Sequence, residues 1–306
     1  MDEKGLNEGI VKALLLDHKR DRRWKNISFF ILFFFIILFF VLAFFPSLLS
    51  FGSSQETEPY VSLVRLNGVI EPGKEFSAEE AIPSLVGAFD DENAKAVVLL
   101  INSGGGSAVQ SSIIYDRLMS LKIEHPEKPL VVIAEDYLAS GAYMVALAAD
   151  EIYVNPNTIT GSVGVISKGF GFAGVIERIG IKRRIFTSGM NKDRLDPFEP
   201  LTEDDRAKLS SVLDEVHDYF VDLVQISRGD KLNGDPEELF SGDFWTGGQA
   251  VELGLVDGTG NLSGILKDKF DVELYRDYSA SGSFVEEFAR SIGVSLETYF
   301  KPKMAY

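Results

Sequence analysis

Apolar and polar stretches alternate along most of the chain, and their lengths and periods predict strands and helices in turn. Short apolar runs typical of buried strands lie at residues 60–66, 95–101, 129–135 and 151–156. Longer segments with apolar residues at helical spacing lie at residues 77–91, 108–121 and 202–228. Because strands alternate with helices, the pattern predicts an α/β fold built on a parallel sheet. Thr202 precedes three acidic residues and predicts where the last of these helices begins.

One segment is apolar on every side. Residues 135–150 read EDYLASGAYMVALAAD, and no charge occurs between Asp136 and Asp150. Helical turns without a polar face predict a helix that is buried all round, beginning near Leu138. Ser140 stands close to the start of this helix and is either a helix cap or a nucleophile. The second interpretation has a physical basis, because free N–H groups and the helix dipole at that end favour a developing negative charge.

A different apolar segment occurs near the N-terminus. Residues 27–50 carry no charge and are rich in Phe, Ile and Leu, and about 20 helical residues are enough to cross the roughly 30 Å hydrocarbon core. The run is longer than the apolar part of a signal peptide and no clean cleavage site follows it, so we expect a retained single transmembrane helix. Basic residues before it predict a cytoplasmic N-terminus, and they are Lys19, Arg20, Arg22, Arg23 and Lys25.

This assignment divides the chain into five parts. Residues 1–26 are predicted to be a cytoplasmic segment, 27–50 the anchor of an inner (cytoplasmic) membrane protein, and 51–59 a polar linker. The body at 60–270 is expected on the periplasmic or extracytoplasmic side, where the absence of cysteine is compatible with an oxidising environment. The remaining tail, 271–306, has a mixed pattern from which we predict no structure.

Composition excludes several classes of function. The net charge of −16 would repel nucleic acid phosphates, so we expect no nucleic acid partner. The chain has no cysteine, which rules out thiolate metal sites and a cysteine nucleophile. Its three histidines, His18, His125 and His217, lie far apart and show no paired ligand spacing. We therefore expect no metal and no cofactor.

Two glycine-rich segments are candidates for anion binding. The sequence INSGGGSA at residues 101–108 follows a predicted strand and opens a predicted helix, where consecutive glycines can turn backbone N–H groups towards an oxyanion or a phosphate. It is not a Walker motif, and a plain strand-to-helix turn is the alternative. The sequence GFGFAG at 169–174 matches a dinucleotide-binding pattern. However, it comes after several α/β units, and no acidic residue ends the strand predicted at 182–187.

A serine nucleophile needs a base. None of the histidines accompanies a candidate acid in an obvious triad order, so a lysine made neutral by burial is the remaining route. Lys192 lies in the polar loop 187–200, between the predicted strand at 182–187 and the long helix. The alternative for such a loop lysine is a solvated surface side chain.

Four segments, in this order, resemble the signal peptide peptidase A family of membrane-anchored serine peptidases. They are residues 101–108, 139–166, 188–206 and 244–257. The resemblance covers about residues 60–270 and implies a fold related to the Clp protease subunit and the crotonases, with a Ser-Lys dyad. It implies that Ser140 is the nucleophile and Lys192 the general base, and that Ser162 orients the lysine. It also implies an oxyanion hole formed by the N–H groups of Gly105 and Ser140.

The resemblance also implies partners and substrates. Its members degrade apolar peptides such as cleaved signal peptides, and similar proteins form ring- or dome-like oligomers in which serine and lysine come from adjacent subunits. We therefore expect a homo-oligomer whose assembly removes water from Lys192. Three positions depart from the family pattern, and they affect the substrate preference rather than the dyad: Gly104 replaces a usual proline, Ala142 a common glycine and Leu138 a common alanine.

Two other functions remain open. A catalytically inactive membrane scaffold on the same fold would use Ser140 as a helix cap, and a serine-directed inhibitor would then label nothing. A crotonase-like acyl-CoA enzyme would use paired N–H groups for a thioester, although that class usually works in the cytosol with a carboxylate as acid or base. Assays of peptide hydrolysis and thioester turnover separate the peptidase from the acyl-CoA enzyme.

Overall fold

The computed structural model describes residues 29–39 and 58–279. The chain divides into two compact units, Met1–Thr57 and Glu58–Tyr306, and each is considered by itself. In the first unit, residues 29–39 are helical. Among the described residues no helix combines the length and apolar character needed to cross a bilayer. The predicted anchor at 27–50 lies largely outside the described residues and stays a prediction.

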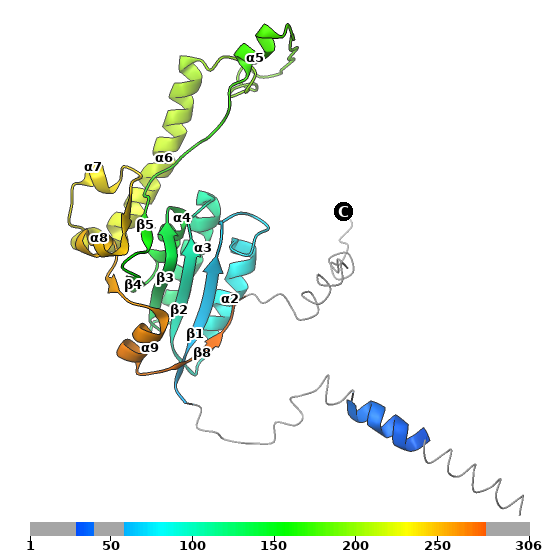
Figure 1. Ribbon diagram of the computed structural model, residues 1–306, viewed down its shortest axis with the longest axis vertical. Helices are drawn as coiled ribbons and strands as arrows, with labels where there is room; N and C mark the ends of the chain where they lie inside the picture. Colours follow the sequence, from blue (N-terminus) through cyan, green and yellow to red (C-terminus); the bar gives the residue numbers. More distant parts are fainter. Residues whose placement is uncertain (1–28, 40–57, 280–306) are drawn as a thin grey trace, which may run out of the picture. The chain divides into compact units, whose positions relative to one another are not determined.

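The second unit is built on an eight-stranded sheet in which β6, β5, β3, β2, β1 and β8 follow one another, while β4 pairs with β3 and β7 pairs with β4 (Figure 1). All pairs are parallel except β5 with β6. The predicted α/β construction with a parallel sheet is therefore confirmed. The strands are β1 (Tyr60–Asn67), β2 (Ala94–Ser103), β3 (Leu130–Ala139), β4 (Glu151–Val154), β5 (Ile159–Gly161), β6 (Phe244–Thr246), β7 (Gly258–Thr259) and β8 (Leu274–Asp277).

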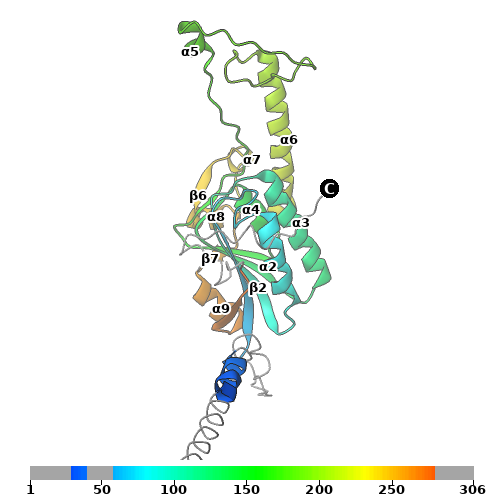
Figure 2. The ribbon, with the colours of Figure 1, turned by 90° about the vertical axis from the view of Figure 1, so that its right-hand side faces the viewer.

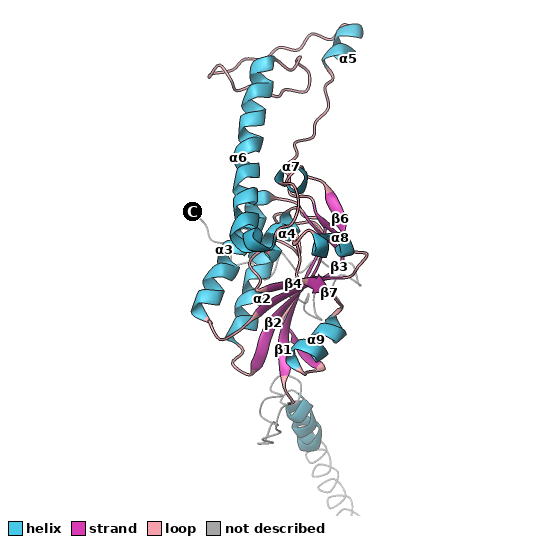
Figure 3. Cartoon of the chain, turned by 90° about the vertical axis from the view of Figure 1, so that its left-hand side faces the viewer, coloured by secondary structure: helices cyan, strands magenta, loops and turns pink. Residues whose placement is uncertain are grey.

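Helices cover the two faces of the sheet unequally. The helices are α2 (Ala78–Asp90), α3 (Ala108–Glu124), α4 (Gly141–Ala146), α5 (Ala173–Arg178), α6 (Glu203–Arg228), the 3₁₀ turn η2 (Gly229–Lys231), α7 (Pro236–Leu239), α8 (Gly247–Glu252) and α9 (Leu262–Phe270). Side chains of α2, α3, α4 and the C-terminal part of α6 share one large apolar core with one face of the sheet. On the other face, α9 is the one helix within residues 58–279 that packs over a smaller core (Figure 3).

A long extension leaves this body after β5. Residues 164–202, which include α5, run away from the sheet, and α6 leads back to it (Figures 1 and 2). The strand predicted at 182–187 is wrong, because this part of the extension has no neighbouring strand with which to pair. The long helix predicted at 202–228 is confirmed as α6, and Thr202 begins it with a capping box to Asp205.

The sheet also continues into the segment for which the sequence predicted no structure. Strand β8 pairs in parallel with β1, from Tyr60 opposite Leu274 to Leu63 opposite Asp277. The folded body thus extends beyond residue 270, the boundary that the sequence suggested.

Candidate active site

Ser140 occupies the junction between β3 and α4. The helix predicted from Leu138 begins only at Gly141, because Leu138 and Ala139 still belong to β3. All six residues of α4 are buried, which confirms the all-round burial expected from their composition. Ser140 has φ +53° and ψ −126°, a backbone conformation that is uncommon for a residue with a side chain and occurs often at functional sites. Its side chain makes no capping hydrogen bond, so the helix-cap interpretation does not describe this serine.

The glycine turn 104–106 lies directly against Ser140. An added Cβ on Gly105 would come within 2.7 Å of both Ala139 O and Gly141 N, and within 2.8 Å of Ser140 Cβ. Gly105 has φ +94°, which suits glycine for a second reason. The turn is held in place by a β-bridge between Gly106 and Ile70, three residues after the end of β1, in which Ile70 N donates to Gly105 O at 3.0 Å. The structure therefore brings the glycine turn and Ser140 together.

The two N–H groups predicted as oxyanion donors are both engaged. Ser140 N donates to Gly161 O at 2.8 Å, and Gly105 N donates to Ser103 Oγ at 3.1 Å. The prediction that Ser140 contributes its own N–H is therefore wrong in this structure, because β5 takes that donor. The N–H of Gly105 is likewise held by the Ser103 hydroxyl and is not directed to a free acceptor.

Two neighbouring N–H groups have no such partner. Within residues 58–279 no hydrogen bond is recorded from Gly106 N or from Gly141 N. An added Cβ on Gly141 would lie 3.4 Å from Gly106 N, so the two glycines are neighbours beside Ser140. Gly141 was not among the donors predicted from the sequence. The rule that the first N–H groups of a helix lack partners would have pointed to it, because the residue after Ser140 begins α4.

Lys192 does not meet Ser140 within one chain. It lies in the extension, in the loop between α5 and α6, and its side chain is exposed. Its backbone N donates to Gly189 O at 3.2 Å. Figure 1 shows α4 inside the body, whereas the α5 region lies at the far end of the extension. The predicted base is thus separated from the predicted nucleophile in the single chain.

Ser162 lies between these two regions. It directly follows β5, has φ +51°, and its backbone N donates to Asp243 O at 2.7 Å. The residue before it, Gly161, accepts the hydrogen bond from Ser140 N. Ser162 is therefore close in sequence to the backbone anchor of Ser140 and stands where the extension leaves the sheet.

The short helix behind Ser140 is fixed by buried polar contacts. Tyr143 Oη donates to Leu255 O at 2.6 Å, and burial raises the pKa of this phenol far above its ordinary value. Nearby, Arg228 and Lys231 both contact Asp257 at 2.7 Å. Burial alone would raise the pKa of Asp257, but hydrogen bonds from these two cations outweigh it and hold the pKa below its ordinary value. The Tyr143 hydrogen bond therefore ties α4, which directly follows Ser140, to the segment that contains Asp257.

A buried helix that begins just after a strained serine, beside a glycine turn with free N–H groups, is the arrangement of a serine acyl-transfer site. Among the described residues, no group of three or more His, Asp or Glu side chains is arranged to hold a metal ion.

Comparison with known proteins identifies the family. Residues 122–271 match the model of peptidase family S49. The resemblance to signal peptide peptidase A proteins is thereby confirmed.

Three curated proteins illustrate the similarity. The putative signal peptide peptidase SppA of Enterococcus faecium is 31% identical over 227 residues, which cover 69% of this chain and 65% of that protein. Serine protease SPPA, chloroplastic, of Arabidopsis thaliana is 30% identical over 221 residues, or 70% of this chain and 32% of that protein. A Brucella abortus (strain 2308) protein named Na(+)/H(+) antiporter NhaA is 44% identical over 220 residues, or 70% of this chain and only 29% of its own length.

Proposed function

We propose that the protein is a membrane-anchored serine endopeptidase that uses Ser140 as nucleophile and Lys192 of an adjacent subunit as general base. Its substrates are apolar peptides, such as cleaved signal peptides. The observation that carries this proposal is the backbone of Ser140, which is strained, uncapped and packed against a glycine turn. The family match supports a peptidase, and the curated relatives include proteins named as serine protease and signal peptide peptidase. We further propose that the body is related to the Clp protease and crotonase folds.

The free N–H groups beside Ser140 suggest how the reaction is stabilised. Attack of the Ser140 hydroxyl on a peptide carbonyl places a negative charge on the carbonyl oxygen. Gly141 N and Gly106 N are the donors without partners at this position, and we assign them the role of the oxyanion hole. Each donor of this kind contributes about 10²–10³ in rate in comparable enzymes.

The base must come from outside the single chain. A lysine ammonium cannot accept a proton until its charge has been lost, and this requires removal from water. In the single chain Lys192 is exposed. Phe186 and Met190, on the same loop, are 93% and 91% exposed, and apolar side chains in that state favour a partner that covers them. A second copy of the chain would cover these side chains and exclude water from Lys192. It would also bring Lys192 next to the Ser140 of the neighbouring subunit. Ser162, at the root of the extension, would then orient the incoming amine.

Apolar substrates suit the surface beside the glycine turn. Val69, Val109 and Ile113 are exposed apolar side chains next to the bridge between Ile70 and Gly106. An extended peptide that adds as a strand along this turn would place its side chains against that surface. An anchor at residues 27–50, with the body on the periplasmic or extracytoplasmic side, would hold the enzyme where apolar fragments leave the membrane.

A complementation experiment with the full chain tests the proposal. Ser140→Ala and Lys192→Ala are each expected to abolish hydrolysis of an apolar peptide while leaving the unfolding temperature unchanged. Coexpression of the two inactive variants in equal amounts should restore about a quarter of the activity, because in a closed ring half of the serines and half of their partner lysines are intact. Lys168→Ala, also in the extension, is the matched control and should stay active.

Other outcomes would overturn specific parts. Full activity of Lys192→Ala would remove the base assignment, and an inactive mixture would remove the assignment to adjacent subunits. Failure of a fluorophosphonate to label wild-type protein at Ser140 would favour an inactive scaffold. Turnover of a thioester but not of a peptide would favour acyl-CoA chemistry.

A further inference from the structure

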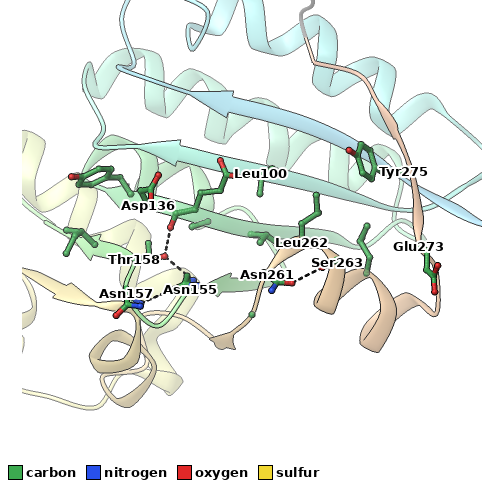
Figure 4. Close-up of a pocket in the computed structure, with 17 residues that line it drawn as sticks. Leu100, Asp136, Asn155, Asn157, Thr158, Asn261, Leu262, Ser263, Glu273 and Tyr275 are labelled. Atoms are coloured by element: carbon green, nitrogen blue, oxygen red, sulfur yellow. Dashed lines mark hydrogen bonds between the residues drawn. The ribbon is translucent and has the colours of Figure 1, made fainter.

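A cavity of about 860 Å³ opens on the α9 face of the sheet (Figure 4). Its lining comes from the carboxyl ends of β2 and β3, the β4–β5 loop, the start of α9 and β8. The cavity exists because α9 packs over residues in the earlier parts of the strands, such as Val98 and Val131, and leaves the ends of β2 and β3 uncovered. Its size is that of a ligand pocket, and carboxyl ends of parallel strands are where open α/β sheets bind ligands.

The floor and the rim of this cavity differ in chemistry. Leu100, Ile133 and Leu266 belong to the smaller apolar core and form the floor. The rim is polar, and Figure 4 shows Asp136, Asn157 and Asn261 among the labelled side chains around the opening. The cavity can therefore hold a ligand with an aliphatic portion and a polar end.

The charge of the rim is negative and only partly compensated. The lining contains the carboxylates Glu135, Asp136 and Glu273 and no lysine or arginine. Glu273 lies 3.6 Å from Lys267 of α9. Among the described residues, neither Glu135 nor Asp136 forms an ion pair, and Asp136 Oδ2 accepts only a hydrogen bond from Asn102 Nδ2 at 3.1 Å.

Arg65, a cation near Glu135, is already engaged. Arg65 of β1 contacts Asp277 at 2.9 Å and lies over the ring of Tyr275. An irregularity in the pairing of β2 with β3 presents the two adjacent carboxylates, because Ile101 pairs with Ala134 but Ser103 pairs with Leu138. Two neighbouring carboxylates that form no ion pair within residues 58–279, above an apolar floor, favour a ligand that carries a positive charge on an aliphatic chain.

We propose that this cavity binds an aliphatic ammonium group, carried as a lysine side chain on an extended peptide. The methylene groups lie on the apolar floor, and the ammonium group meets Glu135 and Asp136. The amide side chain of Asn157 lies on the rim, where it can bond the peptide's own backbone groups, for which a free diamine has no counterpart. Asn261 Oδ1 already caps α9 by accepting from Gly264 N at 2.9 Å.

The cavity shares two strands with the active-site serine. Tyr137, which lines it, pairs with Ile159 of β5, and Ser140 follows three residues later on the same chain segment. Strand β5 ends at Gly161, whose carbonyl oxygen holds Ser140 N. A peptide bound here therefore rests on the strands that position the serine. The binding inference does not depend on the proposed function, because no step of it requires catalysis.

The test measures binding by the full chain carrying Ser140→Ala, so that no peptide is cleaved. Two fluorescent peptides are compared by anisotropy, identical except that one has lysine where the other has norleucine. We expect the lysine peptide to bind about tenfold more tightly or better, the ratio that corresponds to about 1.4 kcal/mol. When Glu135→Gln and Asp136→Asn are added to the Ser140→Ala chain, the two peptides should bind with equal affinity. Glu237→Gln with Glu238→Gln is the matched control, because it removes two adjacent exposed carboxylates on α7, and it should preserve the difference.

Two further results decide whether a peptide is the source of the ammonium group and whether the cavity is where it binds. Competition by 1,5-diaminopentane should be weak. Binding of the diamine as tight as that of the lysine peptide would overturn the peptide as the source of the ammonium group. Equal affinity for lysine and norleucine peptides, or equal losses in the α7 control, would overturn the cavity itself as an ammonium site. Unchanged unfolding temperatures in both double variants confirm that binding, not folding, is compared.

Discussion

The body and the extension of this chain differ in how completely each buries its own apolar side chains. In the body, every residue of α4 is buried, and the central strands lie between α9 on one side and α2, α3 and α6 on the other. In the extension, α5 has no buried residue, and Phe186 and Met190 are almost fully exposed. The body reaches this arrangement within one chain, whereas the extension leaves apolar side chains exposed, as expected for a surface that contacts another molecule under the proposed function.

The helix α6 contains both situations. Its C-terminal part buries Phe220, Leu223 and Val224 in the body, while its N-terminal part belongs to the extension and begins with a capping box at Thr202. Local capping thus defines the start of the helix where packing does not. Under the proposed function, the body would hold Ser140 in place, and the extension would reach its final surroundings only when the subunits assemble.

The largest effect is expected from charging the apolar surface of the extension. The double variant Phe186→Asp and Met190→Asp should dissociate the oligomer and lower peptide hydrolysis by about 10³-fold or more, because two desolvated charges in an interface cost several kcal/mol and Lys192 would stay in water. Sedimentation and a peptide assay on the full chain measure the two effects.

A matched substitution on the body separates the effect of lost assembly from the effect of an added surface charge. Ile123 on α3 is 79% exposed, and Ile123→Asp should change neither the sedimentation coefficient nor the activity. If the extension variant remained an active oligomer, the contrast between the two regions would lose its functional meaning. An equal loss in Ile123→Asp would instead indicate that the body also belongs to the interface.

An intermediate effect is expected inside the body, at the glycine turn. Gly105→Ala would place a methyl group 2.7 Å from Ala139 O and Gly141 N at a φ of +94°, so the turn or Ser140 must move. We expect hydrolysis to fall by about 10²-fold, as for the loss of one oxyanion donor, together with a loss of stability of about 1–3 kcal/mol.

The neighbouring glycine provides the control for this substitution. Gly104 has no atom within 4 Å of an added Cβ and no positive φ, so Gly104→Ala should retain most of the activity and stability. Rates and urea unfolding curves of the two variants are compared. Equal behaviour of both variants would contradict the contact between the turn and Ser140.

The same contrast explains what the sequence could predict. Burial of α4 followed from its composition, and the start of α6 from Thr202, since both depend on local pattern or capping. The strand predicted at 182–187 failed because a strand needs a pairing partner that a local pattern does not specify. The hydrogen bond from Ser140 N to Gly161 O joins β5 to the active site across 21 residues of sequence, and no local rule would have found it.

The smallest effect is expected at the edge of the sheet, where β8 pairs with β1. Asp91, which is buried, accepts hydrogen bonds from Tyr278 at 2.6 Å and from Tyr60 at 2.9 Å, and Arg276 lies 3.2 Å away. Tyr278 directly follows β8, so this cluster ties the last strand to the sheet. Burial alone would raise the pKa of Asp91, but the hydrogen bonds from the two tyrosines, together with the Asn93 N–H and Arg276, hold the pKa below its ordinary value of 3.8.

A carboxyl group whose folded-state pKa is depressed stabilises the protein above its unfolded-state pKa, and this contribution is lost as the pH falls through the folded-state value. Tyr278→Phe removes one donor to this carboxylate and should lower the free energy of unfolding by about 1–2 kcal/mol at pH 7. The difference from wild type should shrink in strong acid, where Asp91 is protonated in both states. Tyr275→Phe, whose exposed hydroxyl contacts only Arg65 at 3.3 Å, should cost much less. Urea unfolding from pH 7 down into strong acid measures the effect, and a loss in Tyr278→Phe that does not vary over this whole range would mean that packing rather than the Asp91 carboxylate holds β8 in place.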